Sequence, residues 1–183
     1  MGHAPVAAYP GLQAKNVIVE VTFRYGESTE PWHHQCFRIA ADHRPKVTGH
    51  IVSAWANPNN DFIETGFLLQ HIRKTPEKKI VEDLLLDRQP LRVNASVWYT
   101  AVLEIVEDEA LFRMGDHVAY AKADQIRMPK NLVSLTFGTT WHEIKRVRIW
   151  EGKANSNWKA SKAAVLKRRK PFAPRTHDYR KPQ

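Results

Sequence analysis

Apolar and polar residues alternate in short runs along the stretch from Val97 to Trp150. Acidic residues at 107–109 and the pair Gly115-Asp116 separate the first of these runs. Alternating runs joined by such turns are typical of β-hairpins, because successive side chains of a strand point to opposite faces. The stretch therefore predicts the closing half of a β-sandwich. The runs cover residues 98–106, 111–114, 117–120, 131–137 and 142–150.

The first half of the chain predicts further strands, since it carries similar runs rich in β-branched and aromatic residues. Residues 56–61 read as a loop, because Asn and Pro favour tight turns. Residues 73–90 fit a short amphipathic helix as well as a strand, and we favour the strand after a charged loop. The predicted strands cover residues 16–25, 35–40, 48–55 and 66–72.

The alternation stops after Glu151. Residues 157–169 contain good helix formers, and Pro171 and Pro174 end the predicted helix. The last ten residues are expected to be mobile. The expected organisation is a lead-in at 1–14, a sandwich domain at 15–151 and a basic helix and tail at 152–183.

Composition agrees with one folded domain, since 183 residues with 43% hydrophobic residues suit a single core. The net charge of +9 is unevenly placed. Residues 1–151 hold 18 basic and 18 acidic residues, whereas residues 152–183 hold ten basic residues and one acid, Asp178. A neutral sandwich argues against specific nucleic-acid binding, which needs many Lys and Arg on one surface.

The single cysteine and the N-terminal residues exclude further kinds of site and segment. The single cysteine, Cys36, excludes an intrachain disulfide and a cysteine-based zinc site, and its strand setting favours a small buried hydrophobe. The first ten residues lack a basic region followed by an apolar run, so we expect neither a signal peptide nor a transmembrane segment. Localisation stays open, because an exported protein whose leader had been removed would look the same.

The order of the runs resembles the 3-keto-disaccharide hydrolase family, formerly a domain of unknown function. The resemblance spans about residues 15–151 and implies an all-β, concanavalin A-like jelly-roll sandwich of two antiparallel sheets, as in laminin-G-like and glucanase modules. Family members usually carry an extra leading segment, whereas this chain has only a short lead-in. The motifs are Leu-Phe-Arg-Met at 111–114, Gly-Asp at 115–116, His-Val-Ala-Tyr at 117–120, Leu-Val-Ser-Leu-Thr-Phe-Gly at 132–138 and Val-Arg-Ile-Trp-Glu at 147–151.

The resemblance implies chemistry on a sugar that is already oxidised at C3. The ketone acidifies the proton on C2, so a base can remove that proton while an acid protonates the departing oxygen on C1. Elimination and then hydration follow. Such a reaction needs a base, an acid and a group that stabilises the enolate.

Candidate catalytic residues in the first half are His50, Asp61, Glu64 and His71. If the strands that carry His50 and His71 are neighbours, the two rings can approach each other while the loop carboxylates close over one end. The alternative is that Asp61 caps a turn and each histidine is satisfied locally.

Metal binding is weakly indicated. Adjacent residues of an extended chain point apart, so His33-His34 is not expected to grip an ion. Residues 57–61 could offer oxygen ligands to a divalent cation such as calcium, although they lack the spacing of a calcium loop.

The second half adds Glu104 as a catalytic candidate, with Arg113, His117 and Lys130 as neighbours that could stabilise an enolate or contact sugar hydroxyls. The alternative is that these residues form ordinary cross-strand charge pairs. Exposed indoles stack on sugar rings, and a second set of substrate-binding candidates follows from this. These tryptophans are Trp55 and Trp141.

Three functions remain open. The first is cleavage of a 3-keto glycoside, and the second is a non-catalytic carbohydrate-binding or adhesion module of the same fold. The third is an interaction protein whose basic residues at 167–170 meet an anionic polymer or membrane surface.

Overall fold

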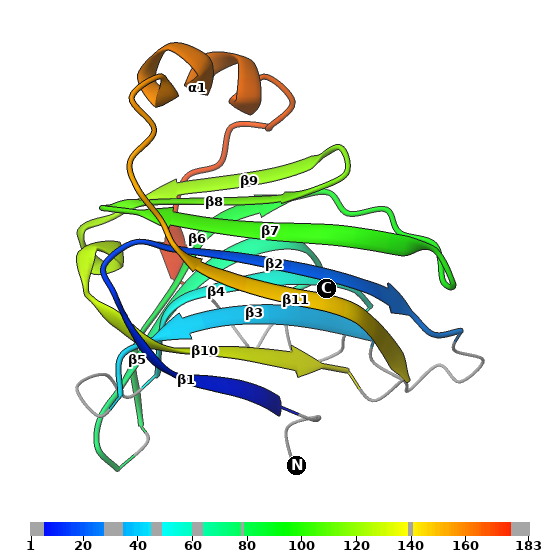
Figure 1. Cartoon of the computed structure of the whole chain (residues 1–183), viewed down its shortest axis with the longest axis horizontal. Helices are drawn as coiled ribbons and strands as arrows, with labels where there is room; N and C mark the ends of the chain where they lie inside the picture. Colours follow the sequence, from blue (N-terminus) through cyan, green and yellow to red (C-terminus); the bar gives the residue numbers. More distant parts are fainter. Residues whose placement is uncertain are drawn as a thin grey trace.

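The computed structural model describes residues 6–27, 35–44, 49–59, 64–77, 79–138 and 141–176. In this part of the chain two β-sheets face each other, and helix α1 stands apart from them (Figure 1). The elements are β1 (Val6–Ala14), β2 (Val17–Tyr25), β3 (Gln35–Asp42), β4 (Gly49–Asn59), β5 (Gly66–Lys74), β6 (Ile80–Gln89), β7 (Trp98–Val106), β8 (Glu109–Met114), β9 (His117–Lys122), the 3₁₀ turn η1 (Asp124–Arg127), β10 (Lys130–Phe137), β11 (His142–Glu151), α1 (Trp158–Leu166) and β12 (Arg175–Thr176).

Both sheets are antiparallel throughout their described strands. The larger sheet has the order β1-β10-β3-β4-β5-β6-β12 and the smaller sheet the order β11-β2-β7-β8-β9. The chain crosses between the sheets after β1, β2, β6, β9, β10 and β11 and runs as meanders through β3–β6 and β7–β9. This arrangement confirms the predicted all-β jelly-roll sandwich.

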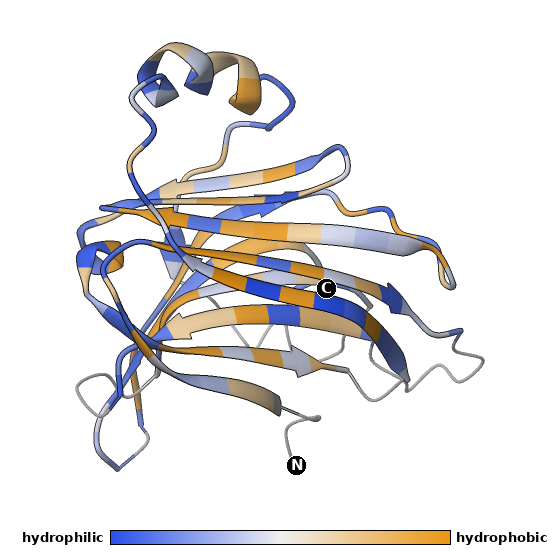
Figure 2. Ribbon diagram, viewed as in Figure 1, coloured by the Kyte–Doolittle hydropathy of each residue, from blue (hydrophilic) through white to orange (hydrophobic). Residues whose placement is uncertain are grey.

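The core lies between the sheets because each strand buries alternate side chains. Val17, Val19, Val21, Phe23 and Tyr25 of β2 are all buried, while the residues between them are partly exposed. The alternation is visible along β2 and β11 (Figure 2). Period-two burial is what allows each sheet to keep one apolar face inside and one polar face outside.

Aromatic contacts join the two sheets across the core. Phe67 of β5 stacks on Phe112 of β8, with ring centroids 4.1 Å apart and planes 7° from parallel. The hydroxyl of Tyr25 donates a hydrogen bond of 2.8 Å to the carbonyl oxygen of Ala56. These contacts fix how the larger sheet sits on the smaller one.

The predicted lead-in at 1–14 contains a strand. Residues 6–14 form β1, which pairs with β10 at the edge of the larger sheet. Pro10 and Gly11 lie where the register shifts, and Gly11 has φ of +93°. Proline and a left-handed glycine are tolerated at an edge strand with a bulge.

Two other expectations concern strand boundaries. The preference for a strand within residues 73–90 is confirmed, because β6 pairs with β5 over most of its length. The predicted loop at 56–61 begins too early, since β4 continues to Asn59. Asn57 pairs with Gly66 of β5, which extends the ladder past Trp55.

The C-terminal helix is confirmed as α1, and a short strand lies within the last ten residues. Arg175 and Thr176 form β12 and pair with Leu85 and Leu84 of β6. The buried carboxylate of Asp87 also binds Arg169, with 2.6 Å between Oδ2 and Nε. Among the described residues, no helix has the length and apolarity to cross a bilayer.

We expect the substitution Phe112→Ala to lower the free energy of unfolding by about 3–5 kcal/mol, because it leaves a cavity opposite Phe67. Phe112→Leu should cost less than about 1.5 kcal/mol, since it keeps most of the volume. Urea denaturation of the two variants and the parent chain measures both values. Equal losses for Leu and Ala would contradict a stacked contact between the sheets.

Candidate functional site

A row of polar side chains covers the outer surface of the larger sheet, on the side away from the smaller sheet. Ile39, Ala54 and Leu69 point into the shared core, so their sequence neighbours point outward. We call this surface the polar face. Its residues are Arg38, Asp42, His50, Trp55, Gln70 and Asp83.

Asp42, His50 and Arg38 form one hydrogen-bonded chain on the polar face. His50 Nδ1 lies 2.9 Å from Asp42 Oδ2, and Arg38 Nη1 lies 3.0 Å from His50 Nε2. Arginine can only donate, so Nε2 accepts and the ring proton on Nδ1 is donated to Asp42. Arg38 Nη2 also donates to Thr136 Oγ1 over 2.7 Å. The imidazole is therefore held in one orientation and one tautomer.

Trp55, Gln70 and Asp83 form a second chain beside the first. Trp55 Nε1 donates to Gln70 Oε1 over 3.0 Å, and Gln70 Nε2 donates to Asp83 Oδ1 over 2.6 Å. The Arg38 guanidinium carbon lies 4.8 Å from the centroid of the Trp55 ring, which links the two chains. The side chains of the polar face therefore hold one another in fixed positions through these contacts.

Sequence reasoning found only His50 and Trp55 of this group. Arg38 and Asp42 lie four residues apart on β3, a spacing that places both on the same face, but the predicted strand at 35–40 ended before Asp42. Gln70 and Asp83 belong to strands whose register the sequence does not reveal. The even spacing of Arg38 and Asp42 was the one sequence signal that could have placed them on the face of His50.

Residues 170–176, which we call the C-terminal strap, run along the edge of the polar face. Phe172 packs against the cluster that contains Trp55, and Trp55 is only 5% exposed. The backbone of Lys170 exchanges hydrogen bonds of 2.8 and 2.9 Å with the Gln89 side chain. An open cavity of about 430 Å³ adjoins the strap near Asn57 and Arg88.

Glu64 lies beside the polar face, but His71 does not share it. Glu64 Oε1 accepts ion pairs from Arg88 Nε at 3.0 Å and from Arg175 of the strap at 2.5 Å. His71 is buried, and its Nδ1 lies 2.9 Å from the carbonyl oxygen of Ile51. Its Nε2 is 3.8 Å from Glu82 Oε2.

The expected approach of His50 and His71 is wrong, although their strands are neighbours. His50 pairs with Ile72, one residue beyond His71. A difference of one residue places a side chain on the opposite face of a sheet. The two histidines therefore serve separate environments.

Glu104 and Arg113 lie together on the outer surface of the smaller sheet, with both sheets between them and the polar face. Arg113 donates to Glu104 Oε2 over 2.8 Å from Nη2 and 3.1 Å from Nε. The two sites belong to opposite sides of the sandwich.

His117 and Lys130 are engaged with backbone groups. His117 Nε2 accepts the N–H of Arg92 over 3.1 Å. Lys130 is fully buried, and its Nζ donates to the carbonyl oxygens of Lys15 and Ile126 over 3.0 and 2.5 Å. Burial, with a smaller effect of Lys15, lowers the pKa of the Lys130 amine from 10.5 to about 8. Both side chains hold the fold together at strand ends.

Trp141 is 51% exposed and directly precedes β11 of the smaller sheet. Arg24 sits between two indoles, with its guanidinium carbon 5.0 Å from the Trp98 centroid and 5.9 Å from the Trp141 centroid. A bidentate ion pair with Glu143 fixes that guanidinium. Trp141 stays a candidate for ring stacking, separate from Trp55.

Asp61 and the pair at 33–34 lie outside the described residues. Across the described ranges, no three His, Cys, Asp or Glu side chains come together as a ligand set for a metal ion. Of the suggested calcium loop, Asn57 uses its amide Nδ2 to donate to the Glu64 carbonyl oxygen over 3.0 Å. Cys36 is buried, which agrees with its expected role as a small hydrophobe.

No protein-family model matches the chain, and no curated protein sequence matches it. The fold is nevertheless similar to solved galectin structures. CG-16, a homodimeric agglutinin from chicken liver, superposes with a TM-score of 0.58 and 7% identity over 80% of this chain and 100% of that chain. A tetrameric galectin from the ball sponge Cinachyrella sp. gives 0.56 and 10% over 80% and 99%, and lactose- and MES-liganded congerin II gives 0.54 and 7% over 80% and 100%. At these identities the likeness establishes the galectin-type jelly-roll fold.

We expect the stability of the chain to rise with pH relative to that of Lys130→Met. The unfolded amine keeps its proton up to pH 10.5, whereas the folded amine loses it near 8, so the unfolded state binds more protons between these values. The difference in unfolding free energy between the two proteins should grow by at most about 3 kcal/mol over that window. Urea denaturation across the window measures it, and a flat difference would contradict a buried, destabilised ammonium.

Proposed function

We propose that this protein is a carbohydrate-binding module and that the polar face holds the sugar. One observation carries the proposal, namely that an indole and several mutually fixed polar side chains share one sheet surface. A sugar presents hydroxyls that donate and accept hydrogen bonds, together with an apolar ring face. His50 is partly exposed and offers a polar contact, and Trp55 offers a ring surface once the C-terminal strap moves. Asp42, Gln70 and Asp83 are buried and hold these two rings in place.

The fold supports the same class of ligand. CG-16 is described as an agglutinin, and the congerin II structure is described as lactose-liganded. Fold-level analogy raises the expectation of carbohydrate binding without placing the site. The polar face supplies the chemical part of the argument.

Binding at Trp55 requires movement of the C-terminal strap, because Phe172 packs over the cluster that contains this indole. A ligand that needs a minor, open conformation binds with an affinity reduced by the fraction of open molecules. Weakening the contact of Phe172 should raise that fraction. The apparent affinity for the sugar should therefore depend on Phe172, although this residue does not contact the sugar.

We expect Phe172→Ala to tighten binding of lactose by about tenfold, because the open fraction rises when a half-buried aromatic contact is removed. His50→Ala should weaken binding by at least about tenfold, since it removes a fixed polar partner. The indole N–H signal of Trp55 in an NMR titration measures both affinities. Cellobiose and maltose serve as further neutral disaccharides.

Ile144→Ala is the matched control for Phe172→Ala, because Ile144 is a partly exposed hydrophobic residue on β11 of the other sheet. Its affinity should equal that of the parent chain. If the Trp55 signal fails to move with all three disaccharides, both in the parent and in Phe172→Ala, the polar face is not a sugar site.

A second candidate function is cleavage of a 3-keto glycoside, as in the hydrolase family that the sequence resembles. The observation that favours it is the pair of Asp42 and His50 beside Arg38. His50 Nε2 would take the proton from C2, and Arg38 would stabilise the enolate oxygen at C3. Arg38 now donates to Nε2, so it must first turn from the ring to the substrate oxygen.

We expect a protein with this activity to release the aglycone from a p-nitrophenyl 3-keto glucoside, and His50→Gln to abolish the release. The amide keeps hydrogen-bonding capacity but cannot take the proton. Absorbance of p-nitrophenolate measures the rate. His43→Gln is the control, and an equal loss in both variants, or no release by the folded parent chain, would rule out catalysis by His50.

A further inference from the structure

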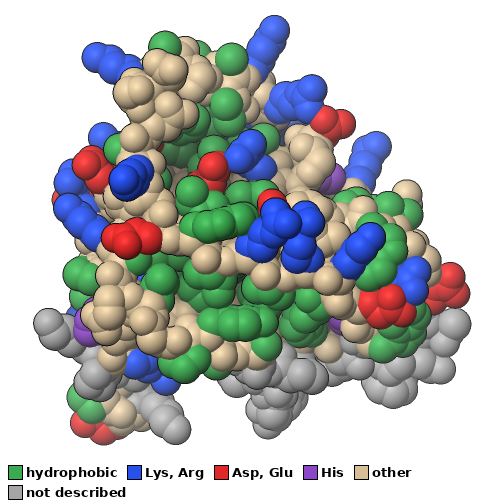
Figure 3. Space-filling view, in the orientation of Figure 1, with side chains coloured by type: hydrophobic (Ala, Val, Ile, Leu, Met, Phe, Trp, Pro, Cys, Tyr) green, Lys and Arg blue, Asp and Glu red, His purple; other side chains and the backbone are tan. Residues whose placement is uncertain are grey.

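A cleft of about 460 Å³ lies between α1 and the outer surface of the smaller sheet. Figure 1 shows α1 standing off the strands, and Figure 3 shows hydrophobic side chains beneath it. Trp158 and Val165 line the helix side, and Ile18, Leu111 and the Glu104–Arg113 pair line the sheet side. The volume is in the range of small-molecule sites, which is roughly 300–1,000 Å³.

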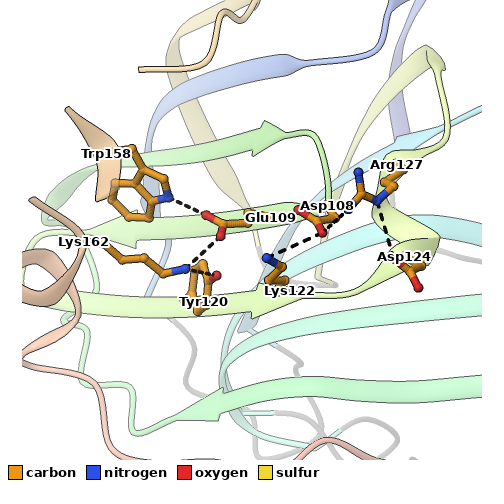
Figure 4. A network of polar contacts seen from close by, with 8 residues as sticks. All are labelled: Asp108, Glu109, Tyr120, Lys122, Asp124, Arg127, Trp158 and Lys162. Atoms are coloured by element: carbon orange, nitrogen blue, oxygen red, sulfur yellow. Dashed lines mark hydrogen bonds and ion pairs between the residues drawn. The ribbon is translucent and has the colours of Figure 1, made fainter. Parts of the chain in front are cut away.

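Polar contacts hold α1 over the sheet at its N-terminal end. Trp158 Nε1 and Lys162 Nζ both donate to the carboxylate of Glu109, the latter over 2.8 Å, and Lys162 also donates to the hydroxyl of Tyr120 (Figure 4). No residue of α1 is buried. The helix is therefore anchored by its side chains and leaves space under its apolar residues.

A second set of contacts fixes the chain just after the helix. Arg168 forms an ion pair with Asp116, and Arg169 forms one with the buried carboxylate of Asp87. Anchors at both ends keep the span between them in place. The cleft is thus a built feature of the fold, since α1 is held at both ends.

The two charged groups of the N-terminal anchor favour each other's charged form. Partial burial opposes the charge on Glu109, but hydrogen bonds from Lys162, Trp158 and Tyr120 outweigh it and lower the pKa of this carboxyl. Partial burial likewise opposes the charge on Lys162, and its bonds to Glu109 and Tyr120 raise the pKa of the amine. Both groups stay charged at neutral pH.

The floor of the cleft has groups that can recognise hydroxyls. Both hydrogen bonds from Arg113 end on Oε2 of Glu104, which leaves Oε1 without a hydrogen-bond partner among the described residues. Lys153 and Glu107 stand at the rim. Acidic and basic side chains are nearly balanced around the cleft, so its charge favours neither an anion nor a cation. The charged lining residues are Glu104, Glu107, Asp108, Glu109, Arg113, Lys122 and Lys153.

We propose that this cleft is a second ligand site, for a neutral sugar of one or two rings. The ring face packs on Trp158, Leu111 and Val165, and the hydroxyls meet Glu104 and Arg113. The site lies on the opposite outer surface from the polar face and does not depend on it. A protein with both sites would hold two glycans on opposite sides of one sandwich.

The test is an NMR titration of the full chain with lactose, cellobiose and maltose. The indole N–H of Trp158 reports on the cleft and that of Trp55 on the polar face, each assigned with its Trp→Phe variant. We expect the Trp158 signal to shift saturably with at least one disaccharide. Glu104→Gln should weaken that binding by about tenfold, as expected for loss of a charged hydrogen-bond partner.

Glu20→Gln is the matched control, because Glu20 forms a similar ion pair of 3.0 Å with Arg146 on the same sheet surface outside the cleft. Exposed pairs of this kind contribute little to stability, so both variants should fold. Shifts at Trp55 without shifts at Trp158 would overturn the second site and leave the polar face standing. No shift at either indole would overturn both, and equal affinities of Glu104→Gln and Glu20→Gln would overturn the assigned floor.

Discussion

The buried carboxylate of Asp87 ties three parts of the molecule together. It accepts the backbone N–H of Tyr120 over 2.8 Å, the Gln89 amide over 2.8 Å and the Arg169 guanidinium over 2.6 Å. Asp87 belongs to the larger sheet, Tyr120 to the smaller sheet and Arg169 to the segment after α1. A fully buried carboxylate is tolerated only when its charge and lone pairs are satisfied, so these partners depend on one another. The anchor also sets where the chain leaves α1 and enters the strap.

A sandwich has two outer surfaces, and the C-terminal residues cover part of each. α1 stands over the smaller sheet, and the strap crosses to the larger sheet, where Phe172 packs near Trp55. Because side-chain contacts hold α1 over the smaller sheet and the helix buries no apolar face there, the cleft beneath it stays open. Covering by Phe172 instead closes the polar face. The C-terminal residues therefore leave the cleft on the smaller sheet accessible and restrict access to the polar face on the larger sheet.

The sequence predicted the strands far better than it predicted the sites, for a physical reason. Alternation is a local property, so β2, β7 and β8 could be read directly. β1 was not predicted, and Pro10 and Gly11 lie at its register shift. Grouping of site residues depends on register, which local patterns leave open. His50 and His71 lie on opposite faces of the larger sheet, because a difference of one residue in register reverses the face to which a side chain points.

Only some of the residue pairs that lie across from each other on neighbouring strands could be predicted from the sequence. Glu104 and Arg113 were proposed as neighbours because they sit on successive strands of one hairpin, and they do form an ion pair. Asp42 and Arg38 were not proposed, although they share the face of His50. Their contact with His50 needs β3 and β4 to be adjacent in a specific register. A hairpin with a short turn fixes such a register from sequence, and a longer connection does not.

The basic tail forms ion pairs within the molecule. Lys162, Arg168, Arg169 and Arg175 each pair with a carboxylate of the sandwich. Part of the positive excess is therefore used inside the molecule, where it orients α1 and the strap. A charge excess at one end of a sequence suggests an external anionic partner only until its contacts are known. Here the neutral sandwich is itself a partner of the tail, and that pairing shapes both candidate sites.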